Sequence, residues 1–109
     1  MQKILRLPES LQEILESVEG KNLDEELIQL IRNDLRRRFH LCSERIMEFE
    51  TKYGMQFEEF VVKWKADKIP NRYSHETERD YMEWESLVDE HEMLLLQLRK
   101  LKSKFPSIP

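Results

Sequence analysis

The hydrophobic residues of one long stretch, 23–53, recur at the spacing of an α-helix. The stretch contains neither Gly nor Pro, and its apolar side chains follow one another at intervals of three or four residues. These side chains are Leu23, Leu27, Ile31, Leu35, Phe39, Cys42, Ile46, Phe49 and Tyr53. Such spacing places all of them on one face of a helix. At about 1.5 Å per residue the helix would be roughly 46 Å long, so it needs a long partner.

A second stretch, from Ser74 to about Ser103, has the alternation of three and four that is typical of coiled coils. Its apolar positions are Trp84, Leu87, His91, Leu94, Leu98, Leu101 and Phe105. Ser74 is a good N-cap residue. Glu76 and Glu78 fall in the first turns, where the helix dipole favours negative charge. We therefore expect a second long helix here.

The connection between the two long helices is expected to be partly helical. Gly54 is a natural stop for the first helix. Residues 56–67 form a short amphipathic pattern, and Pro70 disfavours helix in the linker that follows, 68–73. Two long helices joined in this way should fold back on each other, so 23–105 is expected to form a long antiparallel helical hairpin of coiled-coil type.

The charged residues favour the antiparallel arrangement. If Tyr53 lies opposite His75 and Leu23 opposite Phe105, basic residues of one helix face acidic residues of the other. The expected partners are Arg36, Arg37 and Arg38 with Glu90 and Glu92, Arg45 with Glu83, Arg79 with Glu48 and Glu50, and Arg99, Lys100, Lys102 and Lys104 with Asp24, Glu25 and Glu26. Each surface pair contributes only about 0–1 kcal/mol. Together they oppose a parallel register, which would bring the acidic starts of both helices together.

A short strand and a short helix are expected before the hairpin. Residues 1–7 alternate as in a strand, and Pro8 suits the first turn of a helix that should run over about 9–19. The predicted fold class is therefore mainly α, with a strand–helix–helix unit over 1–38 leading into the hairpin. Residues 106–109 are expected to be a flexible tail.

Composition and charge narrow the function classes. With 109 residues the chain should be one domain, and its net charge of −4 gives no general attraction to nucleic acid. No stretch is apolar and long enough to span a bilayer, so we expect a cytoplasmic protein with no membrane role. The single cysteine, Cys42, lies among the apolar positions and should be buried.

Nothing in the sequence points to catalysis, to a metal or to a cofactor. The chain has no Gly-rich phosphate loop and no Gly-x-Ser-x-Gly motif. His91 lies between apolar positions, and a lone histidine lacks the cluster that a metal site needs. It is expected to be a hydrogen-bonded or interface residue. We therefore expect a protein that is not an enzyme and holds no cofactor.

The N-terminal third has a distinctive order of residues. The run is Ile4-Leu5-Arg6-Leu7-Pro8-Glu9-Ser10-Leu11, followed by Gly20-Lys21-Asn22 and Glu26-Leu27-Ile28. It resembles the ribbon–helix–helix family, in which two chains pair their strands into a ribbon that enters the DNA major groove. The resemblance implies a homodimer that contacts operator DNA. The groove-facing positions would be Gln2, Ile4 and Arg6, with Lys21 and Asn22 near a phosphate. Because three acidic residues follow at 24–26 and would repel that phosphate, the resemblance supports dimerisation more strongly than DNA reading.

Aromatic and acidic residues follow a second distinctive pattern in the middle of the chain. The pattern is Glu48-Phe49-Glu50-Thr51-Lys52-Tyr53-Gly54-Met55-Gln56-Phe57-Glu58-Glu59-Phe60, then Trp64, Ile69-Pro70, Tyr73-Ser74-His75-Glu76 and Asp80-Tyr81-Met82-Glu83-Trp84-Glu85. Over about Arg36 to Leu98 the chain resembles small prokaryotic antitoxins, common in archaea and cyanobacteria, that are encoded beside a small toxin. The resemblance implies a protein–protein role, autoregulation of the operon and no cofactor.

Six large aromatic residues should gather near one end of the hairpin. They are Phe57, Phe60, Trp64, Tyr73, Tyr81 and Trp84. Aromatic residues are over-represented at interface hot spots, and a narrow hairpin cannot bury all six alone, so they are candidate partner-binding residues. A small core that closes this end explains them equally well. The leading hypothesis is an antitoxin that binds and neutralises a cognate toxin. The alternatives are a ribbon–helix–helix DNA-binding regulator and a structural coiled-coil protein.

Overall fold

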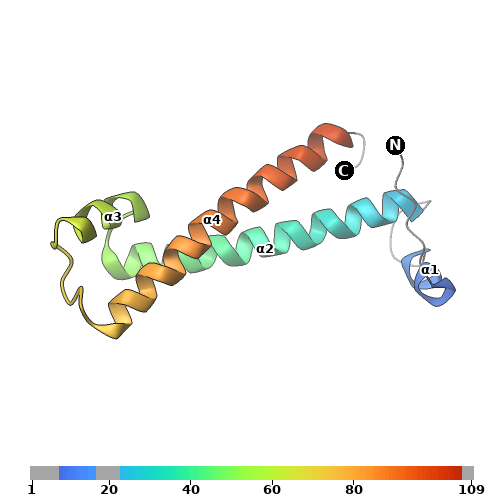
Figure 1. Cartoon of the computed structure of the whole chain (residues 1–109). Helices are drawn as coiled ribbons and strands as arrows, with labels where there is room; N and C mark the ends of the chain where they lie inside the picture. Colours follow the sequence, from blue (N-terminus) through green and yellow to red (C-terminus); the bar gives the residue numbers. More distant parts are fainter. Residues whose placement is uncertain (1–7, 17–22, 107–109) are drawn as a thin grey trace.

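A computed structural model describes residues 8–16 and 23–106 and shows a long helical hairpin (Figure 1). The helices of the described residues are α1 (Glu9–Glu16), α2 (Leu23–Tyr53), α3 (Phe57–Lys65) and α4 (His75–Lys104). The two long helices, α2 and α4, pack against each other and run in opposite directions, while α3 packs near one end. We call the end where α2, α3 and α4 meet the closed end, and the opposite end of the α2–α4 pair the open end.

The predicted mainly helical fold and the pairing of two long helices are confirmed. The bounds of α2 are those that the apolar periodicity predicts, and α4 ends one residue after the predicted Ser103. The short helix α3 occupies the centre of the predicted range 56–67. The predicted strand over 1–7 lies outside the described residues, as do 17–19 of the first predicted helix and 107–109 of the predicted tail.

Local interactions explain why the long helices begin and end where they do. The Ser74 hydroxyl accepts a hydrogen bond from the Thr77 amide at 3.2 Å, as expected of an N-cap. Gly54 has a φ of 67°, in the left-handed region that glycine adopts without steric cost, and its amide donates to the Glu50 carbonyl at 2.8 Å. These two residues therefore separate α2 and α4 from the connection, as the sequence predicts.

The core lies at the closed end and is largely aromatic. Each of three helices and the linker contributes one buried side chain, and these are Phe49, Phe60, Ile69 and Trp84. The ring of Trp84 lies 5.5 Å from that of Phe49 and 5.0 Å from that of Phe60, measured between centroids. Such ring pairs contribute about 0.5–1.5 kcal/mol beyond their buried area. This packing holds α3 against both long helices.

A smaller contact between α2 and α4, made of hydrogen bonds and a ring stack, lies halfway along the hairpin. Cys42 is buried, as predicted, and its thiol donates to the Leu87 carbonyl at 3.0 Å. Burial raises the pKa of this thiol. The His91 ring stacks on Phe39 with centroids 4.2 Å apart, and its Nε2 lies 2.8 Å from the Ser43 hydroxyl. His91 is therefore a hydrogen-bonded residue of the helix interface, as the sequence predicts.

Ion pairs confirm the antiparallel register only near the closed end. Arg45 binds Glu83 at 2.6 Å, as predicted, and Lys52 binds Glu76 at 3.3 Å in the same register. The expected pairs of the basic residues 99–104 with 24–26 are wrong, because no described residue of α4 in that range forms an ion pair.

The arginine cluster in the middle of α2 also departs from its expected partners. Arg37 and Arg38 bind Asp34 of their own helix at 2.8 and 3.0 Å, and not Glu90 or Glu92. Residues three and four apart on a helix are neighbours, so the local carboxylate is reached without crossing to α4. Arg79 likewise makes no ion pair with Glu48 or Glu50 among the described residues, and Glu48 binds Arg45.

We expect replacement of Trp84 to test the aromatic core. Trp84→Ala should lower the free energy of unfolding by about 3–5 kcal/mol, because the fully buried indole packs against rings from α2 and α3. Trp84→Phe should cost less. It keeps a ring and removes an indole N–H that has no hydrogen-bond partner among the described residues. Urea unfolding followed by circular dichroism would measure both variants, and equal losses would contradict this account.

Candidate functional site

The structure divides the six predicted partner-binding aromatic residues into three groups. Phe60 and Trp84 are fully buried in the core. Phe57, Trp64 and Tyr81 are half-buried and pack against that core. Tyr73, in the linker before α4, is 75% exposed. The closed end is thus a core whose outer residues remain accessible, and only the outer residues can contact a partner without unfolding.

Arg72 joins the exposed Tyr73 and the half-buried Trp64 into one cluster. Its guanidinium carbon lies 5.0 Å from the centroid of the Trp64 ring and 5.2 Å from that of the Tyr73 ring. Both distances are within the range of cation–π interactions. Its Nη1 lies 3.4 Å from the Asp67 carboxylate. We call Trp64, Arg72 and Tyr73 the tip cluster, because the linker that carries two of them lies at the far tip of the hairpin (Figure 1).

The linker that carries Arg72 and Tyr73 is anchored by a hydrogen bond and a buried side chain. Asp67 and Asn71 have φ values of 55° and 59°, in the left-handed region that Asp and Asn tolerate better than most residues. The Lys68 amide donates to the Lys63 carbonyl at 2.8 Å, and the buried Ile69 anchors the segment in the core. The side chains of the tip cluster are therefore presented from a fixed backbone.

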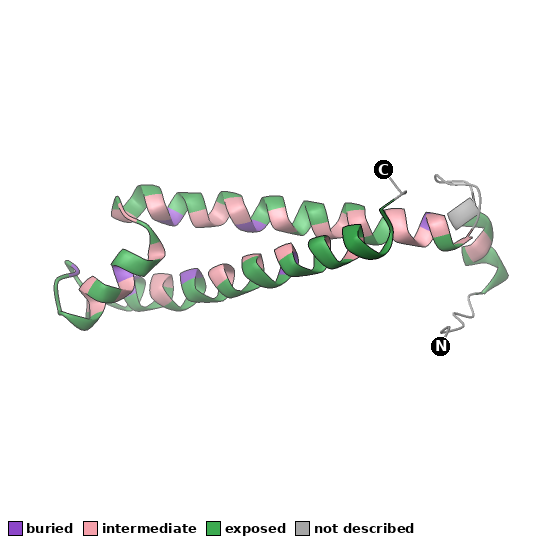
Figure 2. Cartoon of the chain, turned by 90° about the horizontal axis from the view of Figure 1, so that it is seen from above, coloured by how far each residue is buried: buried purple, intermediate pink, exposed green. Residues whose placement is uncertain are grey.

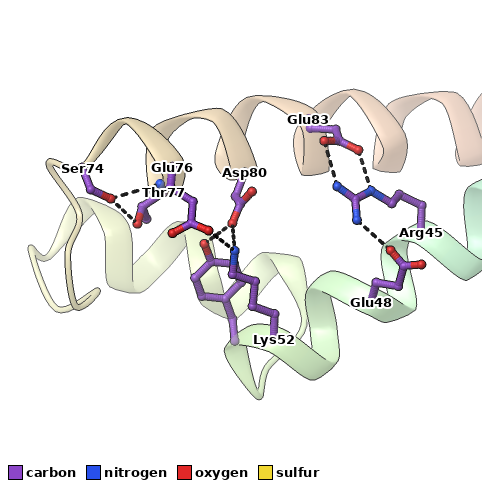
Figure 3. Close-up of polar contacts among 9 residues, drawn as sticks. Arg45, Glu48, Lys52, Ser74, Glu76, Thr77, Asp80 and Glu83 are labelled. Atoms are coloured by element: carbon purple, nitrogen blue, oxygen red, sulfur yellow. Dashed lines mark hydrogen bonds and ion pairs between the residues drawn. The ribbon is translucent and has the colours of Figure 1, made fainter.

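Polar contacts between α2 and α4 hold the closed end together from the side (Figure 3). Asp80 accepts hydrogen bonds from Lys52 Nζ at 2.6 Å and from the Tyr53 hydroxyl at 2.5 Å. Burial opposes ionisation of Asp80, but these two donors outweigh burial and lower the pKa of its carboxyl. Burial, followed by the hydrogen bond to Asp80, raises the pKa of Tyr53 to about 12.

A second cross-helix contact lies two turns away and involves Arg45. The guanidinium binds Glu83 of α4 through Nε at 2.6 Å and Nη2 at 3.1 Å, and it binds Glu48 of α2 through Nη1 at 2.6 Å. The hydrogen bond from Arg45 lowers the pKa of the Glu83 carboxyl. The same guanidinium carbon lies 4.4 Å from the centre of the Phe49 ring, so it also covers the core.

The described residues hold no group of His, Cys, Asp and Glu side chains that is suited to a metal ion. None of their helices is long and apolar enough to cross a membrane. The candidate DNA-contacting residues Gln2, Ile4, Arg6, Lys21 and Asn22 all lie outside the described residues. The site that the structure builds from the predicted residues is therefore the aromatic closed end.

Sequence reasoning missed Arg72, although it carries the link between Trp64 and Tyr73. Its position next to an aromatic residue in a short linker was the available signal. That signal does not reveal which ring the guanidinium covers, because the answer depends on how the linker turns after α3. Comparisons with protein families, with curated proteins and with solved structures find no match to this chain.

We expect acid to weaken the closed end through Asp80. Because its pKa is lowered in the fold, Asp80 stabilises the protein above the ordinary carboxyl pKa of about 3.9, and this stabilisation is lost as the pH falls through the lowered value. Asp80→Asn should cost about 1–3 kcal/mol at neutral pH and make the acid dependence shallower. Urea unfolding at neutral and acidic pH would measure both effects.

The matched control for this prediction is Glu85→Gln, which changes an exposed carboxyl on the same helix. It should leave both the stability at neutral pH and the acid dependence close to those of the unchanged protein. If Glu85→Gln flattened the acid dependence as much as Asp80→Asn, the stabilisation would come from the overall charge and not from the Lys52–Tyr53–Asp80 contact.

Proposed function

We propose that this chain is a protein-binding helical hairpin that neutralises a cognate toxin by covering part of the toxin's surface. The observation that carries the proposal is the tip cluster. Trp, Tyr and Arg are the residue types most enriched at the hot spots of protein interfaces. Here Trp64, Arg72 and Tyr73 are gathered in one contact, and Tyr73 is exposed.

The surroundings of the tip cluster favour binding. Its linker is anchored by the buried Ile69, so little conformational freedom remains to be lost when a partner binds. Two further apolar side chains of the elements that build the closed end are also largely exposed: Val62 on α3 is 67% exposed and Met82 on α4 is 70% exposed. Neither contributes to the core, so both side chains are accessible to a partner that covers the closed end.

The mode of action follows from what the hairpin presents. The tip cluster offers a contact surface at the closed end. Neutralisation by this chain is steric in this proposal: the closed end occupies a surface that the toxin needs. The resemblance to small prokaryotic antitoxins supplies the class of partner and implies control of the operon. The resemblance of the N-terminal third to the ribbon–helix–helix family implies homodimerisation.

We expect the toxin contact to depend on the tip cluster. Co-expression with the small protein encoded beside this chain should yield a complex. Tyr73→Ala and Arg72→Ala should each weaken binding by about ten-fold or more, as hot-spot residues do. Calorimetric titration of the purified pair would measure the loss. Tyr73→Ala should leave the unfolding midpoint nearly unchanged, because the side chain is 75% exposed.

Leu41→Ala is the matched control for the toxin contact, since Leu41 is 54% exposed and lies more than three turns before the end of α2 at the closed end. It should bind like the unchanged chain. Two results would overturn the proposal: a neighbouring protein that never co-purifies with the chain, or a gene without a small neighbour. If Tyr73→Ala and Arg72→Ala both bind the toxin as tightly as the unchanged chain, the toxin does not bind at the tip cluster.

The proposed control of the operon has its own test. A gel shift on the DNA upstream of the gene should show a complex that weakens steeply as salt is raised, because phosphate contacts release counterions. Arg6→Ala should reduce the shift. If no shift is seen at low salt, the proposed ribbon–helix–helix DNA-binding role is wrong. The proposed toxin contact is not affected by that result.

A further inference from the structure

A groove lies on the flank of the closed end, where α2, the start of α3 and α4 come together. Its volume is about 380 Å³, and its apolar lining is Ile46, Met47, Phe57 and Val88. Figure 2 shows that half-buried residues surround the few buried ones along the hairpin. Ile46, Phe57 and Val88 are half-buried in this way, because they pack against the buried core. The floor of the groove is therefore the outer side of that core, and the groove is preformed.

The fixed charge that lines this groove has one sign. Glu50 of α2 and Glu58 of α3 line it, and no Lys or Arg of the described chain does. Neither of these carboxylates forms an ion pair among the described residues, whereas those of Glu48, Asp80 and Glu83 do. The groove therefore combines an apolar floor with negative charge that the described chain does not neutralise.

The neutral polar groups of the groove leave the two carboxylates available. The Ser43 hydroxyl and the His91 ring both line the groove, and they lie in hydrogen-bond contact with each other at 2.8 Å. Gln56 precedes α3, and its side chain makes no cap hydrogen bond. No side-chain hydrogen bond of the described residues reaches Glu50 or Glu58. Both carboxylates can therefore accept hydrogen bonds from a partner.

A long cationic side chain has the chemistry that fits this groove. Lys and Arg join an apolar stem to a charged head, so the stem would cover the apolar floor while the head meets Glu50 and Glu58. An arginine head can also bind a carboxylate through two parallel hydrogen bonds. A purely apolar side chain would cover the same floor, but it would take water from the carboxylates without offering them a donor, which costs free energy.

We propose that the groove receives an arginine or lysine side chain from a basic segment of the toxin. The inference rests on the proposed function, because the toxin supplies the segment, and it adds the charge of the toxin surface that is covered. Phe57 and Glu58 of the groove begin α3, and Trp64 of the tip cluster lies next to its last residue. The helix has nine residues and is about 14 Å long, so one partner can span both contacts.

Removal of the two charges tests the groove. Glu50→Gln with Glu58→Gln should weaken toxin binding about ten-fold or more at low salt, because Gln keeps the shape of Glu and removes its charge. Binding by the unchanged chain should weaken as salt is raised, and the double variant should lose much of this dependence. Calorimetric titration with the small protein encoded beside this chain, at low and high salt, would measure both effects. The unfolding midpoint should stay close to that of the unchanged chain.

The matched control makes the same change of net charge outside the groove. Glu59 of α3 and Glu90 of α4 are exposed and do not line the groove. Glu59→Gln with Glu90→Gln should bind the toxin nearly as tightly as the unchanged chain and should keep most of its salt dependence. If this control weakened binding as much as Glu50→Gln with Glu58→Gln, the overall charge and not the groove would attract the toxin, and the proposal would be overturned.

Three other results separate this inference from the proposed function. If the unchanged chain forms no complex with the toxin, both are overturned. If the complex forms and Glu50→Gln with Glu58→Gln binds as tightly as the unchanged chain at every salt concentration, only the inference about the groove is overturned. If the chain alone self-associates at low salt and the same double variant abolishes that association, the groove holds a second copy of the chain, which also overturns the assignment to the toxin.

Discussion

The contact of Phe60 with Trp84 is the interaction on which the rest of this structure depends. Two long helices with narrow apolar faces gain little from pairing alone, since most of their residues remain in water and helical stability in proteins comes mainly from packing. Phe60 brings α3 against both long helices, where its ring meets Trp84 of α4 and Tyr53 of α2. The position of α3 then fixes the linker, and the linker fixes Arg72 and Tyr73.

A consequence is that the hairpin has two unlike ends. The cross-helix ion pairs of the described chain, Arg45 with Glu83 and Lys52 with Glu76 and Asp80, all lie beside the aromatic core. Toward the other end the helices separate in the view of Figure 1, and apolar and basic residues of the described chain line two grooves. Packing at one end presents the contact residues from an anchored linker, whereas the other end exposes apolar side chains such as Ile31 and Phe105.

The sequence predicted the helices better than it predicted their contacts, for a physical reason. Helix bounds follow from local signals, so the apolar period of α2, the stop at Gly54 and the cap at Ser74 could all be recognised. The Arg45–Glu83 pair also followed, because it lies where the two helices stay close. Pairing by register treats the helices as rods at constant separation, so it fails where they diverge. Composition likewise could not separate the buried Phe60 from the exposed Tyr73, since burial depends on how α3 turns.

The length of the hairpin keeps its closed end and its open end far apart. The α2 helix has 31 residues, and at about 1.5 Å per residue it separates its two ends by roughly 46 Å. A partner at one end therefore does not obstruct a contact at the other.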